Sequence, residues 1–132
     1  MALNLWALDK SAHVRLAAGS ALPAGISPAR LAICEMGVLE WLYSAQSARS
    51  YDAQNTELRA AFTILEAPDD IFARVLRLQA DLAHHRGMWH RRALGDLFIV
   101  ETALSHEAGV IHADSDFELI QKVRPGLMLK SL

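Results

Sequence analysis

The stretch Ala93-Leu-Gly-Asp-Leu-Phe-Ile-Val-Glu-Thr-Ala-Leu-Ser-His-Glu-Ala-Gly-Val-Ile-His-Ala-Asp114 decides the fold class of this chain. Apolar residues recur at helical spacing from Ala93 to about His106, and Gly109 ends the helix. The residues that follow, 110–112, form a short apolar run typical of a strand buried on both faces of a parallel sheet. A helix followed by a buried strand that ends near an acid, Asp114, is a unit of an α/β protein.

Short apolar runs alternate with helical patterns along the rest of the chain. We predict strands at 3–8, 31–34, 63–65 and 110–112, with a final edge strand at 127–129. We predict helices at 10–18, 35–48, 52–62, 68–84, 93–106 and 115–120. This alternation predicts an α/β fold in which helices flank a mostly parallel central sheet.

Composition limits the class of protein. The chain has 132 residues, of which 52% are hydrophobic and 21% charged, so we expect a single domain spanning 1–132. Because no apolar run is long enough to cross a bilayer and no secretory signal is visible, we expect a cytoplasmic protein. The single cysteine, Cys34, excludes an internal disulfide, and we expect it to be buried. The net charge of -2 does not by itself favour nucleic-acid binding.

Four acids fall at positions where carboxylates are costly. Asp9 and Asp114 each follow an apolar run, at the edge of the sheet where α/β proteins bind ligands. Glu40 and Asp96 lie on apolar helical stripes and are expected to point inward. A bound Mg²⁺ or Mn²⁺ would offset the cost and could activate water against a phosphodiester. Helix caps and surface salt bridges remain an open alternative on spacing alone.

The neighbouring acids are sorted by helical angle. Glu35 and Glu101 each lie five residues from a member of the predicted cluster, about 140° around the helix, so we place both outside it. Glu35 suits the first turn of its helix, where the dipole favours an acid. Asp116 follows the strand-end Asp114 in a loop, and we rank it second to Asp114 as a ligand.

Several motifs make the chain similar to the PIN-domain ribonucleases, and in particular to VapC-type toxins of toxin–antitoxin pairs. The resemblance spans nearly the whole length. It rests on Leu8-Asp9-Lys10-Ser11-Ala12, on Leu39-Glu40-Trp41-Leu42-Tyr43-Ser44, on Gly95-Asp96 through Ala103, on Val110 through Glu118, and on the closing Pro125-Gly126-Leu127.

The resemblance implies a PIN-like three-layer fold and a Mg²⁺- or Mn²⁺-dependent endoribonuclease. It assigns metal binding and catalysis to Asp9, Glu40, Asp96 and Asp114, with Asp116 as an auxiliary acid and Ser11 as an orienting hydroxyl. It also implies an RNA substrate, an antitoxin partner and a homodimer. Lys10 stands where the family commonly has threonine, and Glu101 where it usually has a small residue. We expect Glu101 to add negative charge near the RNA path.

The segment 84–92 interleaves basic and aromatic residues just before the helix that carries Asp96. We consider it as an RNA-binding loop, with candidate contacts from Arg86, Trp89, Arg91 and Arg92. A solvated connection with local salt bridges is equally compatible with the pattern. We assign no zinc site to its histidines and a structural role to His112. At least two of Trp41, Tyr43 and Tyr51 are expected to pack in the core, although a partner groove is possible.

Three functions compete at this point. The first is the metal-dependent ribonuclease, and the second is a catalytically silent PIN-like module that binds an antitoxin or RNA. The third is a phosphotransfer protein with a nucleophilic Asp9, which is disfavoured because Ser11 stands where a second aspartate would be needed.

Overall fold

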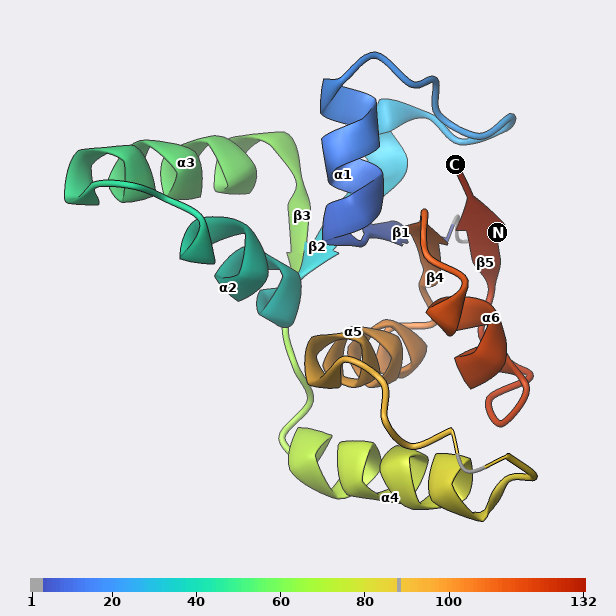
Figure 1. Cartoon of the computed structure of the whole chain (residues 1–132). Coiled ribbons are helices and arrows are strands. Elements are labelled where there is room, and N and C mark those ends of the chain that lie inside the picture. The colour runs from blue at the N-terminus through green and yellow to red at the C-terminus, as the bar shows by residue number, and fades with distance from the viewer. Residues whose placement is uncertain (1–3, 88) are drawn as a thin grey trace.

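The computed structural model describes residues 4–87 and 89–132 and contains one five-stranded sheet, in which every strand is parallel to its neighbours (Figure 1). The strands are β1 (Trp6–Leu8), β2 (Leu31–Cys34), β3 (Thr63–Leu65), β4 (Gly109–His112) and β5 (Leu129–Ser131). Their order is β3-β2-β1-β4-β5, which places β1 in the centre. The predicted α/β fold with a parallel sheet is confirmed.

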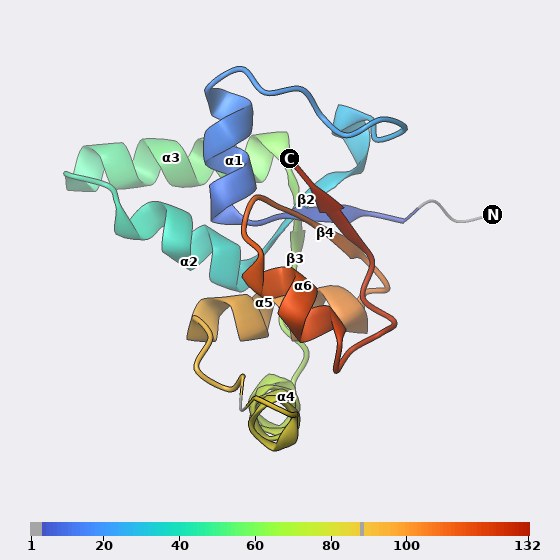
Figure 2. The ribbon, with the colours of Figure 1, turned by 45° about the vertical axis from the view of Figure 1, so that its right-hand side comes forward.

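Helices connect the strands and cover both faces of the sheet. They are α1 (Lys10–Ala17), α2 (Glu35–Tyr43), α3 (Ala48–Ala61), α4 (Ile71–His84), α5 (Leu94–Ser105) and α6 (Asp116–Gln121), with a short 3-10 turn at Pro28–Arg30. Figures 1 and 2 show α1 and α3 on one side of the sheet and α4, α5 and α6 on the other. Helix α2 contacts both α3 and α5.

Successive residues of each strand point to opposite faces of the sheet, and apolar side chains cover both faces. Ala7, Ala32, Cys34 and Val110 pack against α4, α5 and α6, whereas their strand neighbours form a second cluster with Ala12 of α1 and a third with α2 and α3. Because β1 is apolar on both faces, it carries no polar alternation, as expected for a central parallel strand.

Five elements have boundaries that differ from the sequence prediction by more than one residue. The helix predicted at 35–48 ends at Tyr43, and α3 begins at Ala48, because the Ser47 side chain caps α3 by accepting a 3.0 Å hydrogen bond from the Ser50 N–H. Helix α4 begins at Ile71 rather than residue 68. The last strand starts at Leu129, two residues later than predicted, because Leu127 turns into the core. The first strand begins at Trp6, and the predicted position Leu3 lies outside the described residues.

The burial predictions have mixed outcomes. Cys34 is 1% exposed, and burial raises the pKa of its thiol to about 12, as expected for a small core residue. The aromatic prediction was wrong, because Tyr43 is 90% exposed and Tyr51 is 42% exposed. Trp41 is half-buried and stacks on the His13 ring, with 4.0 Å between centroids. Across the two described ranges, no helix has the length and apolar character that a membrane span requires.

Candidate metal and active site

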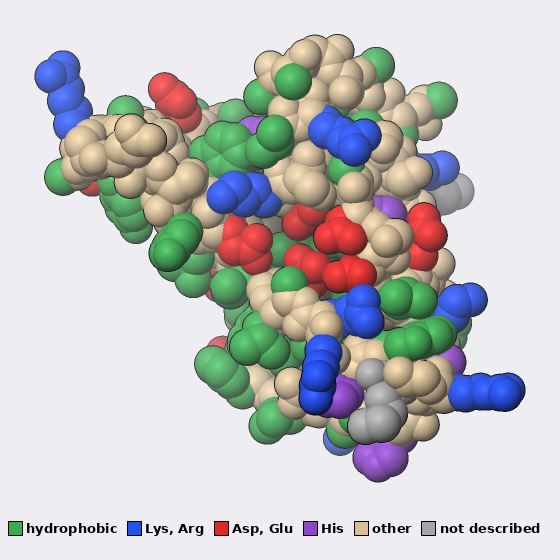
Figure 3. Space-filling view, viewed as in Figure 1, with side chains coloured by type: hydrophobic (Ala, Val, Ile, Leu, Met, Phe, Trp, Pro, Cys, Tyr) green, Lys and Arg blue, Asp and Glu red, His purple; other side chains and the backbone are tan. Residues whose placement is uncertain are grey.

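The carboxyl ends of β1 and β4 lie side by side and bring acids from distant parts of the sequence together. Leu8 pairs with Ile111 in the parallel ladder, and the Asp9 N–H continues it with a 3.0 Å hydrogen bond to the Ile111 carbonyl. Asp9 and the 113–116 loop therefore emerge at the same sheet edge. Figure 3 shows a patch of acidic side chains at the centre of this face, near the point where α1, α2 and α5 meet in Figure 1.

Asp9 is 5% exposed and is fixed by its own helix. It is the N-cap of α1, where its Oδ2 accepts hydrogen bonds from both the backbone N–H (3.2 Å) and the hydroxyl of Ser11. The Ser11 Oγ also accepts a 3.2 Å hydrogen bond from the Ala113 N–H. Ser11 thereby joins the start of α1 to the loop that carries Asp114.

The 113–116 loop is held by its own polar groups. Asp114 N–H donates to His112 Nδ1 at 3.3 Å, and Asp116 N–H donates to Asp114 Oδ1 at 2.9 Å. Asp116 Oδ1 in turn accepts a 2.8 Å charged hydrogen bond from Arg92 Nη1. These contacts orient both loop acids toward the first turn of α5, where Asp96 lies.

Asp96, Asp114 and Asp116 form the tightest group of acids in the described residues. One carboxylate oxygen from each lies within 4.8 Å of the others, a spacing that one cation could bridge. Asp96 is 7% exposed, and burial, followed by the charges of Asp9 and Glu40 and then of the two loop acids, raises its pKa to about 7. The N-terminus of α5 favours a carboxylate at this position, but desolvation outweighs it.

Glu40 reaches the cluster from α2 because a glycine, Gly95, stands in the first turn of α5. A Cβ built on Gly95 would lie 3.0 Å from Glu40 Cδ and closer still to Oε1, so a glycine is required for this approach. Burial and the neighbouring Asp9 raise the pKa of Glu40, while Lys10 opposes that shift. Lys10 Nζ also donates to the Glu40 carbonyl at 3.3 Å.

The structure therefore brings the four predicted acids and Asp116 into one neighbourhood. Asp96, Asp114 and Asp116 meet within 4.8 Å of one another, whereas Asp9 and Glu40 have the larger charge effects on Asp96. The sequence ranked Asp116 below Asp114 because a loop conformation cannot be read from residue spacing. The Asp116 N–H holds the Asp114 carboxylate, and Arg92 holds the Asp116 carboxylate.

The neighbouring acids Glu35 and Glu101 each have a partner of their own away from the cluster. Glu35 lies outside the cluster and accepts a 2.6 Å hydrogen bond from the Ala67 N–H. Glu101 also lies outside it, but our expectation that it adds charge to an RNA path was wrong. It is 5% exposed and pairs with Arg124 Nε at 3.0 Å. Arg124 Nη1 also pairs with Asp81 at 2.8 Å, which links α4, α5 and the turn after α6.

The residues of the predicted RNA-binding loop, 84–92, differ in their exposure and in their contacts. Arg86 and Arg91 are exposed, and Arg92 is half-buried against Asp116. Trp89 packs partly against the core and stacks on His85, with 4.2 Å between ring centroids. One face of the Trp89 ring is therefore taken, and its stacking on an RNA base stays a prediction.

Sequence reasoning quoted Gly95 within a motif but gave it no role, and it did not predict the Arg92–Asp116 pair. A glycine directly before an acid in the first turn of a helix was the available signal for Gly95. Nothing in the residue spacing connects Arg92 with Asp116, because they are 24 positions apart and meet through a loop.

The fold and this acid cluster define a class of protein. A family model for the PIN domain matches residues 5–123, and the chain belongs to the PIN-domain family. More particularly, it is 64% identical over 124 residues to the protein named Ribonuclease VapC17 of Mycobacterium tuberculosis (strain CDC 1551 / Oshkosh), covering 94% of this chain and 92% of the relative. The resemblance inferred from the motifs is confirmed.

Solved structures share the fold at low sequence identity. The chain is similar to one in DNA-bound VapBC from Salmonella typhimurium, with a TM-score of 0.73, 17% identity and 98% of both chains covered. It is also similar to a chain of a toxin–antitoxin complex from Klebsiella pneumoniae, with a TM-score of 0.66, 22% identity and coverage of 95% of this chain and 96% of that one.

Proposed function

We propose that this protein is a Mg²⁺- or Mn²⁺-dependent endoribonuclease and acts as the toxin of a toxin–antitoxin pair. The observation that carries the proposal is the group formed by Asp96, Asp114 and Asp116, bordered by Asp9 and Glu40, in a chain 64% identical to a ribonuclease. The donors are carboxylate oxygens, which are hard ligands that suit Mg²⁺ and Mn²⁺ better than zinc.

The charges at the cluster support a cation. Among residues 4–87 and 89–132, Asp9, Asp96 and Asp114 make no ion pair with Lys or Arg. Asp96 is pushed toward its neutral form by burial and by the other acids, which a divalent cation would reverse. When bound, the ion would supply positive charge at the phosphodiester and lower the pKa of an attacking water.

The chain's own residues prepare the reaction. Asp96, Asp114 and Asp116 would hold the ion, and Ser11 fixes the Asp9 carboxylate by hydrogen bonds. Glu40, whose pKa is raised, lies where it could accept a proton from the attacking water. Exposed Arg86 and Arg91 in the preceding loop are suited to RNA phosphates.

A protein partner is supported by apolar side chains that remain in water. Leu39 is 61% exposed, Phe72 is 72% exposed and Leu94 is 60% exposed, and Figure 3 shows hydrophobic side chains gathered over the α2, α4 and α5 side of the molecule. We propose that an antitoxin covers this surface, and that a second copy of the chain forms a homodimer elsewhere.

RNA cleavage by the purified protein tests the proposal. We expect cleavage with Mg²⁺ or Mn²⁺, none with EDTA, and a loss of about 100-fold or more in Asp9→Asn and Asp96→Asn. The matched control is Glu57→Gln, which changes an exposed acid on α3 and should keep full activity.

Two outcomes would reject the ribonuclease. Full activity in both aspartate variants would show that the cluster does not carry the cleavage. Calorimetry that finds no Mg²⁺ or Mn²⁺ binding, alongside intact antitoxin binding, would instead favour a silent binding module.

A further inference from the structure

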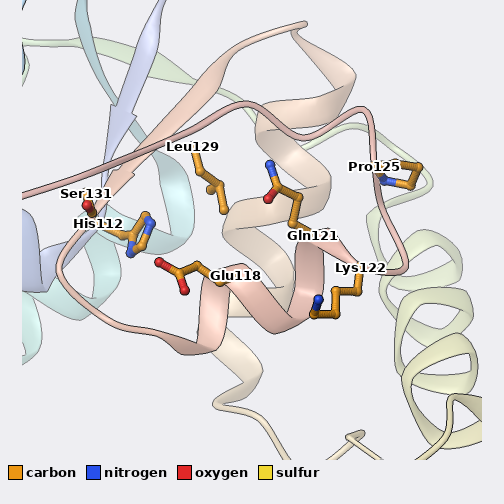
Figure 4. Close-up of a pocket in the computed structure, with 7 residues that line it drawn as sticks. All are labelled: His112, Glu118, Gln121, Lys122, Pro125, Leu129 and Ser131. Carbon is orange, nitrogen blue, oxygen red and sulfur yellow. The ribbon is translucent and has the colours of Figure 1, made fainter.

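A polar cavity of about 640 Å³ lies beside the acid cluster, between α6 and the strands β4 and β5 at one edge of the sheet. Its volume is in the range of small-molecule and cofactor sites. Figure 4 shows the side chains that line it, which are His112, Glu118, Gln121, Lys122, Pro125, Leu129 and Ser131. None of them was assigned a role in RNA cleavage above.

His112 forms a fixed hydrogen-bond donor in the wall of this cavity. The residue is 2% exposed, and its ring packs on Phe117, with 5.3 Å between ring centroids. Nδ1 accepts the Asp114 N–H, so a neutral ring must carry its proton on Nε2. Within the described part of the chain, the structure gives Nε2 no hydrogen-bond partner. Because His112 also lines the cavity, this Nε2–H can donate to a ligand bound there.

Glu118 supplies carboxylate acceptors on the wall of the same cavity. It is exposed on α6, and Figure 4 shows its carboxylate pointing toward the side of the cavity where His112 lies. The Gln121 side chain is fixed, because its Nε2 donates to the Leu127 carbonyl at 2.7 Å. Lys122 adds a cation at the cavity rim.

We propose that this cavity binds a guanine base of the RNA substrate. The Watson–Crick edge of guanine offers two adjacent N–H donors, which match the two oxygens of the Glu118 carboxylate, and a carbonyl acceptor, which matches the His112 Nε2–H. Adenine and cytosine offer one donor group beside an acceptor, and uracil offers a single N–H. Of the four bases, guanine alone matches both the Glu118 carboxylate and the His112 Nε2–H. Lys122 can contact a neighbouring phosphate.

The cavity is connected directly to the acid cluster. His112 bonds to the backbone of Asp114, and Glu118 lies two residues after Asp116 on the same helix. A guanine held here would lie within a nucleotide or two of the cleaved phosphodiester. The subsite rests on the proposed function, because it assumes that the substrate is RNA.

Nucleotide binding tests the subsite without any cleavage. Amide NMR spectra of the ¹⁵N-labelled protein in EDTA would be titrated with GMP, AMP, CMP and UMP. We expect GMP to shift the amides of residues 112, 118, 121, 122 and 131 and to bind at least about fivefold tighter than the others. Glu118→Gln replaces an acceptor by a donor and should weaken GMP about tenfold. Glu57→Gln is the matched control and should not change binding.

Equal binding of the four nucleotides, shifts confined to other surfaces, or no binding would overturn the subsite. Occupation of this cavity by an antitoxin with no response to GMP would overturn it as well.

Cleavage of a randomised single-stranded RNA pool separates the subsite from the proposed function. We expect wild-type protein with Mn²⁺ to prefer guanine at one fixed position near the cut, and Glu118→Gln to cut without that preference. Cleavage by the wild type without a guanine preference overturns the subsite alone. If the wild type cuts no RNA, the proposed function fails, and the NMR titration still decides the subsite.

Discussion

Replacing Asp96 by asparagine should stabilise the metal-free protein at neutral and alkaline pH. The amide has nearly the same shape as the carboxylate but cannot ionise. In the wild type, burial and four surrounding acids raise the Asp96 pKa from 3.8 to about 7, so its ionised form is disfavoured in the folded state. Removing that charge removes the penalty.

The magnitude follows from the pKa shift. The shift spans about three pH units, each worth about 1.4 kcal/mol, which sets an upper limit of about 4 kcal/mol. Because the cluster opens to solvent at exposed Asp114 and salt screens the charges, we expect about 1–3 kcal/mol in 0.15 M salt.

The sign of the pH dependence is fixed by the same shift. Between pH 4 and 7 the unfolded chain loses the Asp96 proton while the folded chain keeps it, so this residue lowers stability as pH rises through that window. Above pH 7 its contribution is constant. Mg²⁺ should restore stability to the wild type at pH 8 and should have little effect on Asp96→Asn.

Urea unfolding followed by tryptophan fluorescence measures these free energies. It would be run at pH 5 and pH 8, in EDTA and in Mg²⁺, with Asp52→Asn as the control because Asp52 is an exposed acid on α3. The reasoning is refuted if Asp96→Asn is less stable than the wild type at pH 8 in EDTA, or if the difference is the same at both pH values.

Two further predictions concern packing around the site. Gly95→Ala should push the Glu40 side chain out of its position and weaken Mn²⁺ binding measured by calorimetry by about threefold or more, with little loss of stability, because the clash is with the flexible end of that side chain. Unchanged Mn²⁺ affinity would contradict the contact. Arg124→Met should leave buried Glu101 without its cation and cost about 3 kcal/mol in urea unfolding. The control is the exposed pair between Arg74 and Asp70, where Arg74→Met should cost less than about 1 kcal/mol. Equal losses of unfolding free energy in the two variants would contradict a buried Arg124–Glu101 pair.

The parallel sheet was predictable because its strands carry their own signal. Segments such as 31–34 are apolar at every position, since both faces of the sheet are covered, and each is followed by a helical pattern. The break between α2 and α3 was missed for a local reason. Helical periodicity runs through residues 44–47, and the cap made by Ser47 decides where one helix stops and the next begins.

The acid cluster was predictable in membership but not in geometry. Asp9 and Asp96 could be found because an acid at a strand end or on an apolar stripe is costly without a partner. The position of Asp116 depends on a loop turn and on Arg92, which residue spacing does not encode.

The prediction for Glu101 failed for a related reason. Its cation, Arg124, comes from a turn 23 residues later, so sequence suggested an unpaired charge where the structure has a buried pair.

The acid cluster depends on the pairing of β1, the central strand, with β4. β1 is synthesised before one of its two neighbours, β4, which is made of residues 109–112. The acid cluster therefore cannot form until most of the chain is available and β4 pairs beside β1, which is a contact of high sequence separation and slow closure. An incomplete chain that stops before β4 would carry Asp9, Glu40 and Asp96 without the loop that completes the cluster. The order of the strands thus makes the assembled acid cluster depend on the pairing of β1 with β4.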